Sequence, residues 1–202
     1  MNDPIALMAV LSAGFILGLK HATDADHVVA VSTLVNGSDS PKVAIRTGAL
    51  WGIGHTFTLM LVCLVVVPLN IPISGSMEAF IEGLVGVMLV ALGFRVVGRW
   101  RETSEGAQHS TGGGAGYRSL FVGAVHGFAG SAALTILILS TVDSLAIGML
   151  YVVVFGLGSM IGMLLFSGFL TIPLRLLGKR AETWAGFASI VTGVIVLLRA
   201  LP

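Results

Sequence analysis

Apolar residues occur in about six long stretches, separated by short polar or proline- and glycine-rich segments. These stretches predict helices at residues 5–35, 43–68, 77–99, 119–140, 144–170 and 183–200. Several of them exceed the ~18–20 apolar residues that a helix needs to cross a bilayer. The pattern therefore predicts an all-α integral membrane protein with about six transmembrane helices.

Prolines and small polar residues set the expected helix limits. Pro4 suits a first helical turn, and residues 36–41 form a turn cluster. Pro173 is expected to close the fifth helix. Residues 102–118, mostly Gly, Ser and Thr with few apolar positions, are expected to form a flexible cytoplasmic loop.

Composition agrees with insertion in a lipid bilayer. The chain is 55% hydrophobic and only 10% charged, whereas a soluble domain carries roughly 25% charged residues. The 27 glycines suit membrane helices whose backbones approach closely. A net charge of +1 gives no case for nucleic-acid binding, and Cys63, the only cysteine, excludes an internal disulfide. The first apolar stretch lacks the features of a cleavable signal peptide, so we expect it to be retained.

Basic residues are concentrated in alternate loops. Basic residues lie in the loops after the first, third and fifth expected helices, or at the ends of these helices. They are Lys42, Arg46, Arg95, Arg99, Arg101, Arg118, Arg175, Lys179 and Arg180. Cytoplasmic loops collect such residues. We therefore expect a cytoplasmic (inner) membrane protein with both termini outside, against which only Arg199 argues.

The two halves of the chain resemble each other at an offset of about 104–105 residues. Residues 18–21 (G-L-K-H) align with 123–126 (G-A-V-H), and 51–55 (W-G-I-G-H) align with 155–159 (F-G-L-G-S). Chance similarity between glycine-rich apolar helices is the alternative.

If the repeat is real, residues 1–101 form a first three-helix repeat and residues 119–202 a second, with the 102–118 loop between them. An odd number of helices inverts the second copy in the membrane. Inverted repeats of this kind are a hallmark of secondary transporters.

A polar run interrupts the first apolar stretch. Each charged residue there costs at least ~2.5–3.5 kcal/mol to insert, and an intramembrane ionisable residue is by default a functional candidate. Imidazole nitrogens and carboxylate oxygens are ligands for Ni²⁺, Co²⁺, Zn²⁺ and Cu²⁺. The candidate ligands are His21, Asp24, Asp26 and His27. A polar knot that only holds helices together is the structural alternative.

Geometry leaves the position of Asp26 open. On an ideal helix His21, Asp24 and His27 share an arc of about 120°, and Asp26 points elsewhere. Either Asp26 orients a histidine ring from behind, or the helix is unwound at this point.

Other polar residues lie in the apolar stretches. His55 is a further candidate ligand, and His126 is a metal or pathway candidate, although a single membrane histidine can equally bond a neighbouring helix. Asn36, Ser32 and Thr33 are candidate pathway residues, although such hydroxyls commonly bond the backbone. Lys20 is expected to balance charge.

Residues 21–27 have the form H-x-x-x-x-D-H within G-L-K-H-A-x-D-A-D-H. This run resembles the signature of the nickel/cobalt transporter (NiCoT) family, and the stretches around His55 and His126 look like further family segments. The resemblance implies that His21, Asp26, His27 and, through a less specific motif, His55 recognise metal. The chain is shorter than the eight-helix members. It is similar to the short UreH-type members, which implies a link to a urease or hydrogenase maturation system.

The sequence therefore predicts a transporter and not an enzyme, with Ni²⁺ or Co²⁺ as substrate and no permanent cofactor. No nucleotide-binding motif occurs in it, so uptake must use an ion gradient, the membrane potential or a separate subunit. We expect alternating access around the His/Asp site, in a monomer or a homo-oligomer. The rivals are a metal exporter, a haem carrier using His21, His55 and His126, and an accessory membrane protein without transport.

Overall fold

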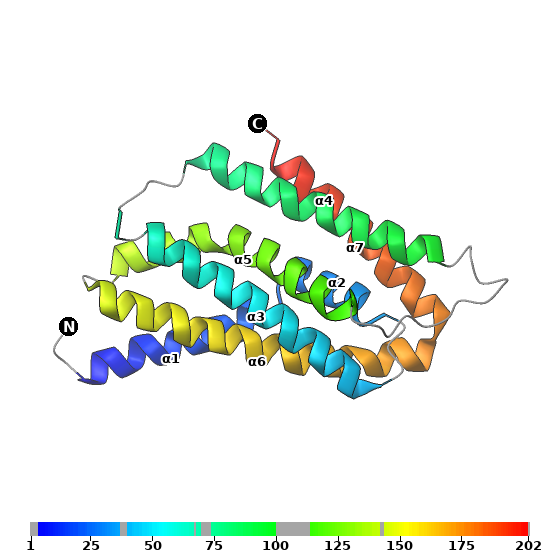
Figure 1. The fold of residues 1–202 in the computed structure, drawn as a ribbon, viewed down its shortest axis with the longest axis horizontal. Coiled ribbons are helices and arrows are strands. Elements are labelled where there is room, and N and C mark those ends of the chain that lie inside the picture. The colour runs from blue at the N-terminus through cyan, green and yellow to red at the C-terminus, as the bar shows by residue number, and fades with distance from the viewer. Residues whose placement is uncertain are drawn as a thin grey trace.

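A computed structural model describes residues 4–36, 40–66, 68–69, 74–99, 114–141 and 144–201. All regular structure in these ranges is helical, as predicted. The helices are α1 (Pro4–His21), α2 (Ala25–Leu34), α3 (Pro41–Val66), α4 (Gly75–Arg99), α5 (Gly114–Thr141), α6 (Leu145–Leu177) and α7 (Lys179–Arg199). Figure 1 shows them running roughly along one long direction, with α4 and α7 paired beside the other helices.

Five helices are long and apolar enough to cross a membrane: α1, α3, α4, α6 and α7, with mean hydropathies of 1.6 to 2.2. Large apolar side chains also cover the outside of the bundle; Phe94 and Phe169, for example, are 62% and 64% exposed. Such a surface suits lipid rather than water. The chain is therefore a multi-pass membrane protein.

The first expected helix is divided in two. α1 ends at His21 and α2 begins at Ala25, and residues 22–24 form a turn between them. The prediction of one helix over 5–35 is therefore wrong. The unwound alternative is observed, together with the other one, because Asp26 also bonds a histidine ring. The break falls within the polar run that interrupts the first apolar stretch.

Two other expected limits differ. Pro173 lies inside α6, which continues to Leu177. Proline removes only one helical N–H, and the helix instead ends at Gly178, whose φ of 59° is accessible to glycine. α5 begins at Gly114, so the last residues of the expected 102–118 loop are helical. The rest of that loop lies outside the described residues.

The helices pack as close pairs. α1 lies on α6, α3 lies along both α5 and α6, α4 lies on α7, and α2 contacts α4, α6 and α7. Glycines stand where backbones meet. A Cβ on Gly18 would collide with the carbonyl of Phe155, and one on Gly123 would collide with the carbonyl of Trp51. Lipid tails give no hydrophobic drive for association, so this close packing holds the helices together.

Hydroxyl groups add polar contacts between helices. Ser159 Oγ on α6 donates to the Gly18 carbonyl on α1 at 3.1 Å. Ser189 Oγ on α7 donates to the Leu89 carbonyl on α4 at 2.7 Å. Each such bond contributes roughly 0.6 kcal/mol in a membrane protein, so the bonds supplement the glycine packing and do not replace it.

Substituting alanine for Gly18 or Gly123 should lower the free energy of unfolding by about 1–3 kcal/mol, because the methyl group has no space against the facing carbonyl. Thermal melting of detergent-solubilised protein measures the effect. Gly98→Ala is the matched control, because nothing lies within 4 Å of a Cβ added there. Equal melting temperatures for Gly18→Ala and Gly98→Ala would contradict this account of the packing.

Candidate metal centre

The break between α1 and α2 is built from local hydrogen bonds. The Lys20 carbonyl accepts from both the N–H and the Oγ1 of Thr23, at 2.8 and 2.6 Å. The Asp24 N–H donates to the His21 carbonyl at 3.0 Å. These bonds satisfy carbonyls at the end of α1 that have no helical partner. The chain can therefore turn inside the bundle without exposing unpaired backbone.

Three imidazoles converge at this break. His21 ends α1, His27 lies in the first turns of α2, and His55 lies in α3. One ligand atom from each lies within 4.8 Å of the other two. The ring centroids are 4.4 Å apart for His21 and His27, and 5.2 and 5.3 Å from these rings to His55. Small shifts would bring all three nitrogens onto one ion, since metal–nitrogen bonds are about 2.0–2.1 Å long.

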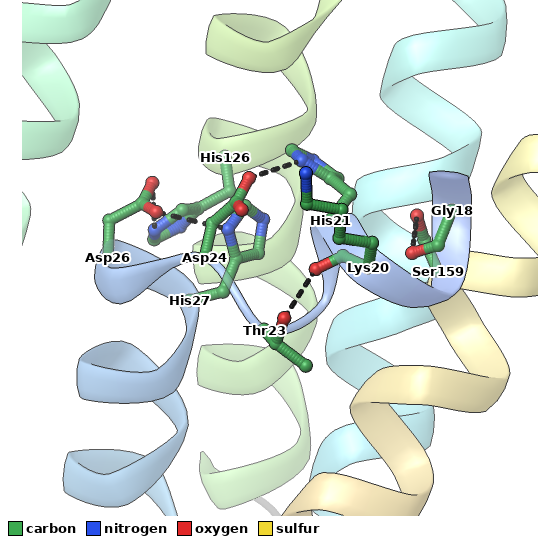
Figure 2. A network of polar contacts seen from close by, with 9 residues as sticks. All are labelled: Gly18, Lys20, His21, Thr23, Asp24, Asp26, His27, His126 and Ser159. Atoms are coloured by element: carbon green, nitrogen blue, oxygen red, sulfur yellow. Dashed lines mark hydrogen bonds and ion pairs between the residues drawn. The ribbon is translucent and has the colours of Figure 1, made fainter. Parts of the chain in front are cut away.

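A carboxylate stands behind two of these rings. His21 Nδ1 donates to Asp24 Oδ2 at 2.8 Å, and His27 Nδ1 donates to Asp26 Oδ1 at 3.2 Å. Because a carboxylate accepts, each Nδ1 carries a proton, and Nε2 is the nitrogen that a neutral ring would offer to a metal ion. Metal-binding histidines are held in this way by a partner on the other ring nitrogen. Figure 2 shows the two carboxylates and the rings around the break.

The Asp24 side chain bonds His21 and does not cap α2. It occupies the N-cap position of α2, yet its side chain makes no capping hydrogen bond. A capping aspartate contributes typically ~1 kcal/mol. The carboxylate is instead turned to His21, which indicates that orienting the ring matters more here than closing the helix.

The nitrogens that point inward have no hydrogen-bond partner. They are Nε2 of His21 and His27, both ring nitrogens of His55, and Nε2 of His126. A buried polar atom left unpaired costs about 1–3 kcal/mol. The lone pairs among these atoms are available to a cation, whereas the N–H of a neutral His55 ring and that of Trp51, which is also unpaired, would need an acceptor.

Exposure falls from the carboxylates to the rings. Asp24 and Asp26 side chains are 49% and 32% exposed, and His21 is 20% exposed. His27 is 3% and His55 0% exposed. The carboxylates therefore lie nearer the surface of the bundle than the rings of His27 and His55.

The structure also brings His126 to the cluster. Its ring centroid on α5 lies 5.0 Å from that of His27, and its Nε2 lies 3.8 Å from Asp26 Oδ2. The predicted residues His21, Asp24, Asp26, His27, His55 and His126 thus form one contiguous group from α1, α2, α3 and α5.

The remaining predicted residues have structural partners. The hydroxyls of Ser32 and Thr33 each donate to a carbonyl of their own helix at 2.7 Å. Asn36 Nδ2 donates to the Glu182 carbonyl at 3.5 Å, which joins the end of α2 to α7. Lys20 has an exposed side chain, and its carbonyl accepts from Thr23. Their roles in a pathway or in charge balance stay predictions.

Sequence reasoning missed three neighbours of the cluster: Trp51, Phe155 and Gly130. The Phe155 ring lies 5.4 Å from that of His21. Trp51 packs its ring 5.2 Å from that of His27 and 5.6 Å from that of His126. Gly130 on α5 faces the metal candidates, because a Cβ there would lie 3.5 Å from His21 Nε2. Trp51 stood in the repeat alignment and could have been found there. Gly130 is one of 27 glycines and carries no signal of its own.

These features define a class: a multi-pass helical membrane protein with a cluster of imidazoles, and partly exposed carboxylates beside them, at a broken helix. Among curated proteins, the chain is 38% identical over 205 residues to the urease accessory protein UreH of Bacillus sp. (strain TB-90), covering 96% of this chain and 89% of the relative. The chain therefore belongs to the UreH family, as its resemblance to short nickel/cobalt transporter family members indicated. No family model and no solved structure matches it.

If this cluster holds a metal ion, Gly130→Ala should weaken binding of Ni²⁺ roughly tenfold, the scale of a disturbed metal site, because the methyl group would lie beside His21 Nε2. The added methyl group would lie beside the free nitrogen of His21, at an ordinary van der Waals distance, so the fold should be kept. Calorimetric titration of purified protein with Ni²⁺ measures the change, and Gly98→Ala is again the control. Parent-like affinity in a folded Gly130→Ala variant would show that no ion binds on that side of His21.

Proposed function

We propose that this protein is a secondary transporter that carries Ni²⁺ or Co²⁺ into the cell across the cytoplasmic membrane. The observation that supports it most is the convergence of His21, His27 and His55, with unpaired nitrogens, at a helix break inside the bundle. The related UreH protein carries the name of a urease accessory protein. A role in supplying metal for urease maturation fits that name.

The ligand types favour a transition metal. Imidazoles suit Ni²⁺, Co²⁺, Zn²⁺ and Cu²⁺, whereas Mg²⁺ and Ca²⁺ prefer sites made of oxygen alone. The carboxylates of Asp24 and Asp26 offset the two charges of the ion. Since Cu²⁺ binds most nitrogen sites more tightly than Ni²⁺, selection of nickel or cobalt has to come from the geometry of the cluster.

The broken helix is oriented for a cation. The C-terminal end of α1, at His21, presents the negative end of its dipole to the break. The positive N-terminal end of α2 is offset by Asp24 at the N-cap and Asp26 in the first turn. Discontinuous helices that place their ends at a midplane ion site are a recurring feature of secondary transporters.

Related contacts in the two halves support the inverted repeat. Gly18 meets the Phe155 carbonyl, and the residues aligned with these two, Gly123 and Trp51, make the equivalent contact. A second pair of contacts follows the same rule: Gly54 meets the carbonyl of Leu120, and Gly158 meets the carbonyl of Phe15. An approximate two-fold axis between the halves would produce this pattern, and the two halves could rock about it to open the site to either side.

The proposal assigns six spans to the chain. α1 and α2 together form one broken span, and α3, α4, α6 and α7 are the other apolar helices. α5 supplies the sixth, because its 28 residues exceed the ~20 that a bilayer requires.

Transport then follows from ligand exchange. A hydrated ion meets Asp24 and Asp26, loses part of its water and binds the nitrogens of His21, His27 and His55. Movement of the halves closes this side and opens the other. Protons compete for the same nitrogens and oxygens, so uptake should fall as the medium becomes acidic.

The central test is labelled-nickel uptake in cells that lack their own importer. His21→Ala and His27→Ala should each reduce uptake at least tenfold, because each removes one of the three nitrogens that hold the ion. His109→Ala is the control, since this histidine lies outside the described residues and outside the proposed site. Uptake at the parent level in membrane-inserted His21→Ala and His27→Ala variants would overturn the site. Nickel leaving the cells instead of entering would favour export.

Orientation has its own test. α3 begins beside the end of α6, where Ile45 contacts Gly168, and this places Lys42 and Arg46 at the same end of the bundle as Lys179. This end should be cytoplasmic because it gathers the basic residues. Lys42→Cys should react with a membrane-impermeant thiol reagent only after cells are opened, and Leu201→Cys should react in intact cells. Buried Cys63 should stay unlabelled in the parent, and the reverse labelling pattern would place the termini inside.

A further inference from the structure

We propose that Asp26 and His126 form a second cation position, which receives the ion from the three-histidine position and passes it toward the second half of the molecule. This inference rests on the proposed transport function and deepens it. It adds a step to the pathway and assigns that step to a histidine of α5, outside the H-x-x-x-x-D-H motif.

The protonation of His126 follows from its partner. Its Nδ1 donates to the Val122 carbonyl at 3.1 Å. A carbonyl oxygen has no proton to give, so Nδ1 carries the hydrogen and Nε2 presents a bare lone pair. That Nε2 atom is buried and has no hydrogen-bond partner. His126 is therefore held as metal-binding histidines commonly are, with a backbone carbonyl behind the ring.

The free nitrogen faces a carboxylate oxygen across a short gap. His126 Nε2 and Asp26 Oδ2 lie 3.8 Å apart, and the histidine side chain is 1% exposed. The distance is too long for a hydrogen bond. A water that donated to both atoms with good geometry would separate them by about 4.6 Å. Two metal bonds of about 2.1 Å each span about 3.0–3.4 Å at angles of 90–109°, so a bridging cation fits once the two side chains move about half an ångström closer.

Asp26 connects the two positions. One of its oxygens, Oδ1, accepts from Nδ1 of His27, which belongs to the first position, and the other faces His126. The rings of His27 and His126 lie 5.0 Å apart. Figure 2 shows Asp26 beside both rings. An ion could thus change partners between the two positions through a movement of a few ångströms and without crossing an apolar barrier.

The position of His126 in the second half of the chain indicates the direction in which the ion moves. His126 aligns with His21 in the repeated G-x-x-H pattern, so the two histidines occupy related places in opposite halves. In this conformation the side chain of His21 is 20% exposed and that of His126 is 1% exposed. The imidazole of the second position is therefore closed in this conformation, although Asp26, which joins the two positions, is 32% exposed. We expect His126 to become accessible when the halves exchange conformations.

The two positions offer different metal-binding atoms, and the second position should release the ion more easily. The first position offers three imidazoles, whereas the second offers one imidazole and one carboxylate oxygen, with water completing the coordination. Fewer nitrogen donors bind Ni²⁺ or Co²⁺ less tightly. An ion that has moved to His126 is accordingly easier to release on the far side.

Two measurements on the same variants test the inference. Calorimetry on purified protein gives the dissociation constant for Ni²⁺, and liposomes loaded with a metal-sensing dye give the rate of nickel entry. His126→Ala should keep the dissociation constant within about threefold of the parent while entry slows at least tenfold. His21→Ala, in contrast, should weaken binding at least tenfold. His109→Ala should match the parent in both measurements.

The outcomes separate this inference from the transport proposal. Binding by His126→Ala at near-parent affinity also shows that the variant is folded. Should His126→Ala fail to bind Ni²⁺, His126→Gln provides a second variant that better keeps the side-chain volume. Loss of Ni²⁺ binding in both variants, at unchanged melting temperature, would make His126 a ligand of a single site. That result would overturn the second position. Parent-like entry in His126→Ala would overturn it too. A parent protein that neither binds nor admits nickel would remove the transport proposal itself and this inference with it.

Discussion

Polar atoms inside an apolar bundle must find partners, and the arrangement around residues 22–24 follows from that constraint. In the turn, the free carbonyls at the end of α1 accept hydrogen bonds from Thr23 and Asp24. It also lets His21 and His27 approach from two helices, each with Nδ1 bonded to a carboxylate. The inward nitrogens remain unpaired. In a medium without water this is costly, and the cation binding that we propose would offset the cost.

The cluster depends equally on close helix packing. Side chains as short as imidazole can meet only if their backbones lie near one another. Gly123 and Gly127 let α5 approach the backbone of α3 at Trp51 and His55. This approach brings His126 within contact of His27 and Trp51. The glycine content therefore serves the candidate site as much as the stability of the bundle.

Much of the fold could be predicted from hydropathy, because membrane helices are set by the length of apolar runs. The expected helices at 43–68 and 77–99 agree closely with α3 and α4. The helix break and the helical Pro173 could not be predicted in this way. Both depend on whether freed backbone groups find local partners, here Thr23 at the break, and hydropathy does not register such partners.

The sequence by itself determined the membrane environment, the approximate helix limits and the kinds of ligand available, because these depend on residue type and on runs of neighbours. It could not decide whether His55 and His126 join the motif or whether Asp26 faces a ring. Those questions concern distances between helices that lie far apart in the chain. Only the tertiary structure brought the imidazoles of α1, α2, α3 and α5 together, because glycine contacts decide which faces meet.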